Sequence, residues 1–140
     1  MFGKGASSSK NMEIIGSEKK FSVLIVDDDP IIRKIHSALL SKFTKEIHEV
    51  KNGKEAVDLC RSGTSFDIIF IDKEMPIMNG LEATKELRAM GVYSTIVGVT
   101  SCDLSSERND FIAAGQNQCY EKPLTIEKIK SLLSELNKNN

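Results

Sequence analysis

The sequence has few cysteines, and their placement excludes two kinds of structure. Its three cysteines are Cys60, Cys102 and Cys119, which lie far apart in the chain. Their number is odd, and none has the spacing of a metal-binding motif. This pattern excludes both a disulfide framework and a cysteine metal site, and it predicts free thiols in a reducing compartment.

Long apolar runs and secretion signals are also missing. No stretch approaches the roughly 20 apolar residues that a membrane-spanning helix needs, and the first residues, MFGKGASSSK, lack the apolar core of a signal peptide. We therefore predict a cytoplasmic protein, and the argument leaves a nuclear location open.

Neither sign of charge is in excess. The chain has 19 basic and 20 acidic residues and a net charge of −1, so it offers no basic face for nucleic acid or an anionic membrane. Its 140 residues, 40% of them hydrophobic, suit one domain with a substantial core. We expect a monomer that binds neither nucleic acid nor membranes.

The chain divides into a short tail and one domain. Residues 1–19 are rich in glycine, serine and lysine and lack periodicity, which predicts a flexible tail. The domain is expected over residues 20–140. Because the last predicted helix ends close to the end of the sequence, we expect no output domain.

Five predicted strands alternate with five predicted helices over this domain. The strands are expected at 21–26, 46–50, 66–71, 95–99 and 118–121. Strict alternation predicts an α/β fold with a parallel sheet and helices on both faces. The second and fifth strands are polar enough for the sheet edges, whereas the other three are apolar enough for its centre. This favours a flavodoxin-like, doubly wound (βα)5 fold with strand order 2-1-3-4-5.

The helices carry recognisable start signals and apolar stripes. Asp29 before Pro30 predicts the start of the first helix, and Asn52 and Glu55 have capping-box spacing in the second. We expect a serine cap near Ser106 in the fourth helix. The first helix is expected to bury Ile31, Ile35 and Leu39, and the last to bury Ile126, Ile129, Leu133 and Leu136.

Acidic residues follow two strands that this order makes neighbours. Asp27, Asp28 and Asp29 follow the first strand, and Asp72 follows the third. Ligands bind in such folds at the carboxyl ends of the strands, where the strand order reverses. Carboxylates crowded there repel one another unless a cation joins them. We therefore predict a site for a hard divalent cation, with Mg²⁺ as the candidate.

Two further polar residues end the fourth and fifth strands at the same edge. They are Thr100 and Lys122. A carboxylate nucleophile, a divalent cation, a hydroxyl and an ammonium group together suit phosphoryl transfer. In this interpretation Asp72 attacks phosphorus and forms an acyl phosphate, while Thr100 and Lys122 bind the phosphoryl oxygens.

Four segments carry a family resemblance: VLIVDDDP, DIIFIDKEMPIMNG, VGVTS and CYEKPLT. They resemble the signature segments of response-regulator receiver domains from two-component signalling, over about residues 21–137. Within that family, IDKEMP and EKPLT look most like the plant type-C regulators of cytokinin-type phosphorelays. The resemblance implies a phosphoryl donor, either a histidine-containing phosphotransfer protein or a histidine kinase.

The resemblance also assigns roles to residues. It implies Asp72 as phosphoacceptor and metal ligand, Asp28 as a direct metal ligand, Asp27 as a ligand through water, and the Glu74 backbone carbonyl as a further ligand. Thr100 would be the switch hydroxyl and Lys122 the phosphate-binding lysine. Receivers commonly have a cis peptide bond at the position of Lys122-Pro123.

The chain departs from the family pattern near the site. Cys119 stands where receivers often have a tyrosine or phenylalanine, and Tyr120 is expected on the other face, so the usual aromatic switch is in question. Ser101 replaces a more frequent alanine, and Glu74 places a carboxylate two residues after the acceptor. We expect no catalytic role for either histidine, His36 or His48.

Three functions compete at this point. The first is a phosphoryl acceptor that works as a phosphate sink and thus as a phosphohistidine phosphatase in effect. The second is a small phosphatase of the haloacid-dehalogenase type, but that family has an aspartate where this chain has Glu74. The third is a phosphate-independent interaction module with a receiver fold.

Overall fold

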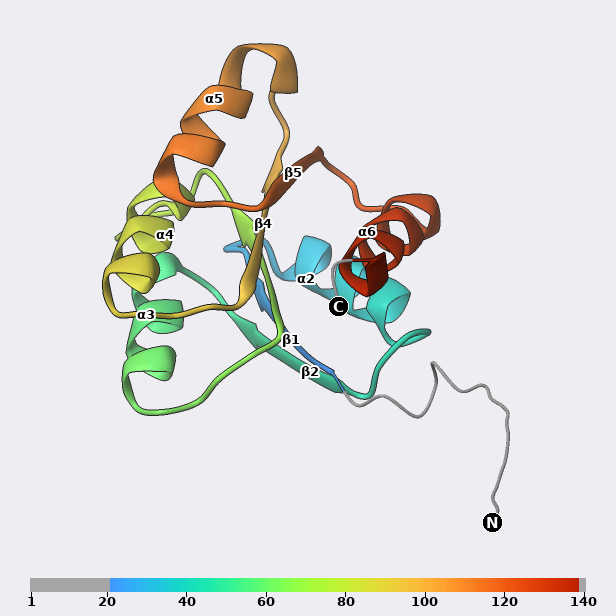
Figure 1. Cartoon of the computed structure of the whole chain (residues 1–140), viewed down its shortest axis with the longest axis horizontal. Helices are drawn as coiled ribbons and strands as arrows, with labels where there is room; N and C mark the ends of the chain where they lie inside the picture. The colour runs from blue at the N-terminus through green and yellow to red at the C-terminus, as the bar shows by residue number, and fades with distance from the viewer. Residues whose placement is uncertain (1–20, 139–140) are drawn as a thin grey trace.

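A computed structural model describes residues 21–138, and the predicted tail at 1–19 lies outside them. Strands and helices alternate strictly along the described chain (Figure 1). The strands are β1 (Ser22–Val26), β2 (Glu46–Val50), β3 (Ile68–Asp72), β4 (Thr95–Thr100) and β5 (Gln118–Glu121). The helices are α2 (Pro30–Leu40), α3 (Gly53–Arg61), α4 (Gly80–Ala89), α5 (Leu104–Ala114) and α6 (Ile126–Lys138).

The five strands form one parallel sheet in the order β2-β1-β3-β4-β5. This confirms the flavodoxin-like order predicted from strand polarity. All five residues of β3 are buried, whereas β2 at the edge exposes Glu46, His48 and Glu49. The strands covered on both faces are the apolar ones, as a doubly wound sheet requires.

Helices cover both faces of the sheet. Figure 1 shows α2 and α6 on one side, with α3, α4 and α5 on the other. Alternate residues of β1 reach the two cores: Val23 and Ile25 pack under α2 and α6, whereas Leu24 and Val26 pack under α3 and α4. The site at the carboxyl ends of the strands is thus supported by two separate apolar layers.

Helix α2 buries a different face from the one expected. Ile31 is 68% exposed and Ile35 is 43% exposed, so their predicted burial is wrong. The buried residues are His36 and Leu40, one turn apart. Apolar periodicity misplaced the face because it treats a histidine as a solvent-facing residue.

Two other helices also differ in detail from their predictions. The cap of α5 is Asp103, whose side chain accepts a hydrogen bond from the Ser105 amide, so the expected cap near Ser106 is wrong. In α6 the buried residues are Ile129 and Leu132, and the remaining predicted positions are only partly buried. The predicted cap of α2 is confirmed, since Asp29 accepts a hydrogen bond from the Ile31 amide at 2.9 Å.

Candidate functional site

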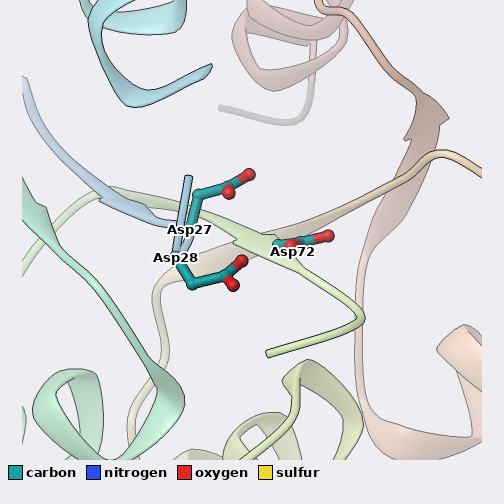
Figure 2. A group of neighbouring side chains, drawn as sticks. All are labelled: Asp27, Asp28 and Asp72. Atoms are coloured by element: carbon teal, nitrogen blue, oxygen red, sulfur yellow. The ribbon is translucent and has the colours of Figure 1, made fainter. Parts of the chain in front are cut away.

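Three carboxylates converge at the carboxyl ends of β1 and β3. Val26 lies beside Ile71 in the sheet register, so the chain continues into Asp27 and Asp28 next to Asp72. One oxygen from each aspartate lies within 4.8 Å of the other two. Figure 2 shows the three side chains extending from the two strand ends into a common region. The convergence predicted from the sequence is therefore present.

This cluster suits a hard divalent cation. Asp27 and Asp72 are buried and Asp28 is exposed, so two fixed carboxylates face a third that is open to water. Mg²⁺ prefers a few carboxylate ligands and keeps several water molecules, and this donor set matches that preference. The cluster therefore provides the carboxylates that the predicted magnesium site requires, and a role for the Glu74 carbonyl in it stays a prediction.

Lys122 already links two members of the cluster. Its Nζ atom lies 2.9 Å from Asp27 Oδ2 and 3.1 Å from Asp72 Oδ1. The lysine follows β5, and the Lys122-Pro123 peptide bond is cis, as expected. The two ion pairs place an ammonium group directly beside the predicted phosphoacceptor.

Burial and neighbouring charges shift the pKa values of Asp72 and Lys122. Burial raises the pKa of Asp72 to about 6, and the neighbouring Asp27 charge adds to this, against the opposing effect of Lys122. Burial alone would lower the pKa of Lys122, but its contacts with Asp27 and Asp72 outweigh burial and raise it. The site thus has more negative charge than its single ammonium group compensates, which favours binding of a cation.

The loop after β3 packs closely against the backbone of Asp72. The Gly80 amide donates a hydrogen bond to the Lys73 carbonyl at 2.9 Å. A Cβ atom on Gly80 would lie only 2.2 Å from the Asp72 carbonyl oxygen, so a side chain there would push against the strand end. Within this loop Ile77 has a φ of 72° and is 75% exposed. The close approach at Gly80 fixes where the backbone of Asp72 lies.

Thr100 ends β4 at the same edge and is 1% exposed. Its hydroxyl donates to Glu107 Oε1 at 3.2 Å and accepts from the Cys102 amide at 3.0 Å. Glu107 Oε2 in turn accepts from Lys73 Nζ at 2.6 Å. The sequence interpretation missed both Glu107 and Lys73. The position of Lys73 directly after Asp72 was the only signal that could have found either.

The position of the usual aromatic switch is occupied by a small side chain. Cys119 is buried, and it lies beside Gly98 in the sheet register. Tyr120 packs instead against the core beneath α2 and α6, so the two side chains lie on opposite faces, as expected. The tyrosine is thus placed away from the face that carries Cys119.

A buried histidine supports the segment that carries Lys122. His36 on α2 is 1% exposed, and its Nε2 atom accepts a hydrogen bond from the Leu124 amide at 3.2 Å. Burial lowers the pKa of His36, which favours the neutral ring that this contact requires. The sequence interpretation did not anticipate this structural role.

Two predictions from composition can be compared with the described residues. Cys60, Cys102 and Cys119 are free, as predicted. Between residues 21 and 138, no helix combines the length and apolarity needed to span a bilayer.

Comparison with known proteins places this geometry in a family. The family model of the response regulator receiver domain matches residues 23–134. The chain is 48% identical over 134 residues to the two-component response regulator ARR22 of Arabidopsis thaliana, covering 94% of this chain and 93% of the relative. It is 36% identical over 122 residues to the two-component response regulator ORR41 of Oryza sativa subsp. japonica, covering 85% and 96% of the two chains.

A solved structure supports the interpretation of the acidic cluster. The receiver domain of a sensor histidine kinase from Pseudomonas aeruginosa, which has a magnesium ion coordinated in its active-site cleft, superposes with a TM-score of 0.72 at 25% identity, covering 84% of this chain and 97% of that one. With its parallel sheet, its acidic cluster and a matching family model over most of its length, the chain belongs to the response-regulator receiver domains and is related to the plant two-component response regulators.

Proposed function

We propose that Asp72 accepts a phosphoryl group from a phosphohistidine in a Mg²⁺-dependent phosphorelay. The observation that carries the proposal is the position of Asp72, a buried carboxylate beside two further aspartates and 3.1 Å from the Lys122 ammonium. An Asp72 oxygen would bond to phosphorus while the phosphorus–nitrogen bond of the donor breaks, and the donor imidazole would leave with that electron pair.

The surrounding residues have distinct roles in this reaction. Lys122 would pair with a phosphoryl oxygen, and its contact with Asp27 keeps it in place. The Thr100 hydroxyl would donate a hydrogen bond to another phosphoryl oxygen. A bound Mg²⁺ would neutralise the charge that develops on the transferred group, held by Asp27, Asp28 and Asp72.

The donor is proposed to be a histidine-containing phosphotransfer protein or a histidine kinase. A solved complex contains the yeast phosphotransfer protein Ypd1 with the receiver domain of its response regulator Ssk1, and it matches this chain with a TM-score of 0.75 at 26% identity, covering 83% of this chain and 88% of that chain. Here, the exposed Ile31 and Ile35 lie on α2, the helix that follows Asp27 and Asp28, and the exposed Ile77 lies in the loop after Asp72. Exposed apolar side chains around a polar site suit docking of a protein.

A phosphotransfer time course tests the proposal. The labelled phosphotransfer protein would be mixed with the wild type, with Asp72→Asn, and with Asp58→Asn as a control at an exposed aspartate on α3. We expect label to leave the donor only with the wild type and the control, and only with Mg²⁺ present. Label that stays on the donor, or an unchanged rate in Asp72→Asn, would contradict the proposal.

We further propose that the acyl phosphate is hydrolysed on this domain. The domain would then remove phosphoryl groups from its donor, in a cytokinin-type phosphorelay, and release them as inorganic phosphate. The relation to plant response regulators supports this pathway. Inorganic phosphate should then accumulate at the rate at which the donor loses label. A stable phosphorylated domain with no release of phosphate would count against the sink role while leaving the acceptor role intact.

The alternative functions have less support. The matching family model is that of receiver domains, and Glu74 stands where a haloacid-dehalogenase phosphatase would have an aspartate. A phosphate-independent docking role gives no physical reason for three carboxylates to crowd together at Asp72. Equal affinity of a partner for the wild type and Asp72→Ala would nevertheless favour the docking role.

A further inference from the structure

A network of three side chains lies next to Asp72 but outside the acidic cluster. It consists of Lys73, Glu107 and Thr100, contributed by the end of β3, the first turn of α5 and the end of β4. One Glu107 oxygen lies 2.6 Å from Lys73 Nζ, and the other lies 3.2 Å from Thr100 Oγ1. The network is largely shielded, since Lys73 and Glu107 side chains are 18% and 15% exposed.

The direction of each hydrogen bond follows from the chemistry of the groups. As a carboxylate, Glu107 has acceptors only, so the hydroxyl must be the donor. Thr100 has a single hydroxyl proton, and its oxygen already accepts a hydrogen bond from the Cys102 amide. Thr100 therefore cannot donate to a phosphoryl oxygen and to Glu107 at the same time.

Glu107 is held in this position from its other side. Its Oε2 atom accepts a hydrogen bond from Lys73 Nζ at 2.6 Å. The Lys73 backbone is itself fixed, because its amide donates to the Val99 carbonyl and its carbonyl accepts from Gly80. A charged acceptor with a fixed partner forms one of the stronger hydrogen bonds in proteins.

We propose that Glu107 competes with the phosphoryl group for the Thr100 hydroxyl and thereby weakens phosphoryl binding at Asp72. The inference rests on the proposed function and deepens it. Glu107 acts here as a positioning residue, since it works through Thr100. Phosphorylation would take the hydroxyl away from Glu107 and free one of its oxygens, which connects the state of Asp72 to the first turn of α5.

Binding of beryllofluoride, a mimic of the phosphoryl group on aspartate, tests this proposal. Its affinity would be measured with Mg²⁺ in the wild type, Glu107→Ala, Thr100→Ala and the double variant. We expect Glu107→Ala to bind at least about threefold more tightly than the wild type. In the Thr100→Ala background, the same substitution should give a clearly smaller gain, because no hydroxyl is left to compete for.

The double comparison separates competition from simple charge effects. Removing Glu107 also removes a negative charge and releases Lys73, and both changes attract anions regardless of Thr100. An equal gain in both backgrounds would therefore overturn the proposal, as would no gain or a loss in the presence of Thr100. Glu127→Ala, at an exposed glutamate on α6, controls for net charge, and Glu107→Gln provides a variant of the same shape should the alanine variant unfold.

The outcomes also separate this inference from the proposed function. If the wild type bound no beryllofluoride with Mg²⁺ and accepted no phosphate, the acceptor role would fail, and this inference with it. If the wild type bound the mimic but Glu107→Ala gave no gain that depends on Thr100, only the role of Glu107 would be overturned.

Discussion

The Nε2 atom of His36 accepts a hydrogen bond from the backbone amide of Leu124, a residue 88 positions further along the chain. The contact joins α2, which follows the acidic residues after β1, to the segment that begins with Lys122. One neutral imidazole thus ties together two parts of the chain that supply opposite charges to the site.

Loss of this acceptor should destabilise the domain. In His36→Leu the buried Leu124 amide would have no partner, and we expect the free energy of unfolding to fall by about 1–3 kcal/mol. His36→Gln offers an oxygen at a similar reach and should recover part of the loss. Urea unfolding at neutral pH measures both, and equal stabilities of the two variants would show that the hydrogen bond contributes nothing.

Ionisation of Asp72 should cost stability when no metal is bound. The pKa of Asp72 is raised from 3.8 to about 6, mainly by burial, so between these values the folded state holds a proton that the unfolded state has lost. Stability therefore decreases as the pH rises through this interval. In EDTA at about pH 7, we expect Asp72→Asn to be more stable than the wild type by about 1–3 kcal/mol.

This difference between the two proteins has two internal controls. It should shrink as the pH falls to about 3, which is below both pKa values, so that Asp72 is protonated in the folded and the unfolded state. At neutral pH it should also shrink when Mg²⁺ is added to the wild type. Thermal unfolding across this pH range checks both trends. A wild type more stable than Asp72→Asn in EDTA at neutral pH would show that the ion pair with Lys122 outweighs burial.

A methyl group at position 80 should disturb the phosphoacceptor by pushing against its backbone. The Cβ atom of Gly80→Ala would lie 2.2 Å from the Asp72 carbonyl oxygen, a backbone atom that cannot rotate away. We expect a loss of about 1–3 kcal/mol in unfolding free energy and slower phosphorylation of the folded fraction. Lys85→Ala, at an exposed position on the same helix, should leave both properties unchanged.

The exposed isoleucines should matter for a protein donor but not for a small one. Ile31→Ser would remove apolar surface beside the site without touching the acidic cluster. We expect slower phosphotransfer from a phosphotransfer protein and an unchanged rate with acetyl phosphate. Ile112→Ser, at an isoleucine near the far end of α5 that is 50% exposed, is the matched control. An equal loss with both donors would point to a damaged site and not to docking.

Strand order and the acidic cluster could be predicted because both depend on local properties of the sequence. The polar residues of β2 exclude it from the sheet centre, and Asp72 directly follows an apolar strand. Parallel strands bring their carboxyl ends to one edge, so Thr100 and Lys122 could be placed there without coordinates.

The supporting contacts could not be found in this way, since they depend on how helices sit on the sheet. His36 interrupts an apolar stripe, and only the packing of α2 shows that it faces the core. Glu107 was missed for a related reason: the true cap, Asp103, starts α5 earlier than the expected cap near Ser106. That shift determines which side chain of the first turn faces Thr100.

The polar edge strand β2 has a consequence for how copies of this domain meet. Its outer side carries backbone donors and acceptors that no sheet neighbour satisfies, which is the kind of surface that recruits strands from other molecules. Glu46 and Glu49 place charged side chains along that border, and Glu49 is paired with Arg33 Nε at 3.2 Å. A strand from a second copy that approached this edge would therefore have to bury charged groups, which is costly. The polar residues that place β2 at the sheet edge therefore also disfavour edge-to-edge strand pairing between copies, which is a route to aggregation.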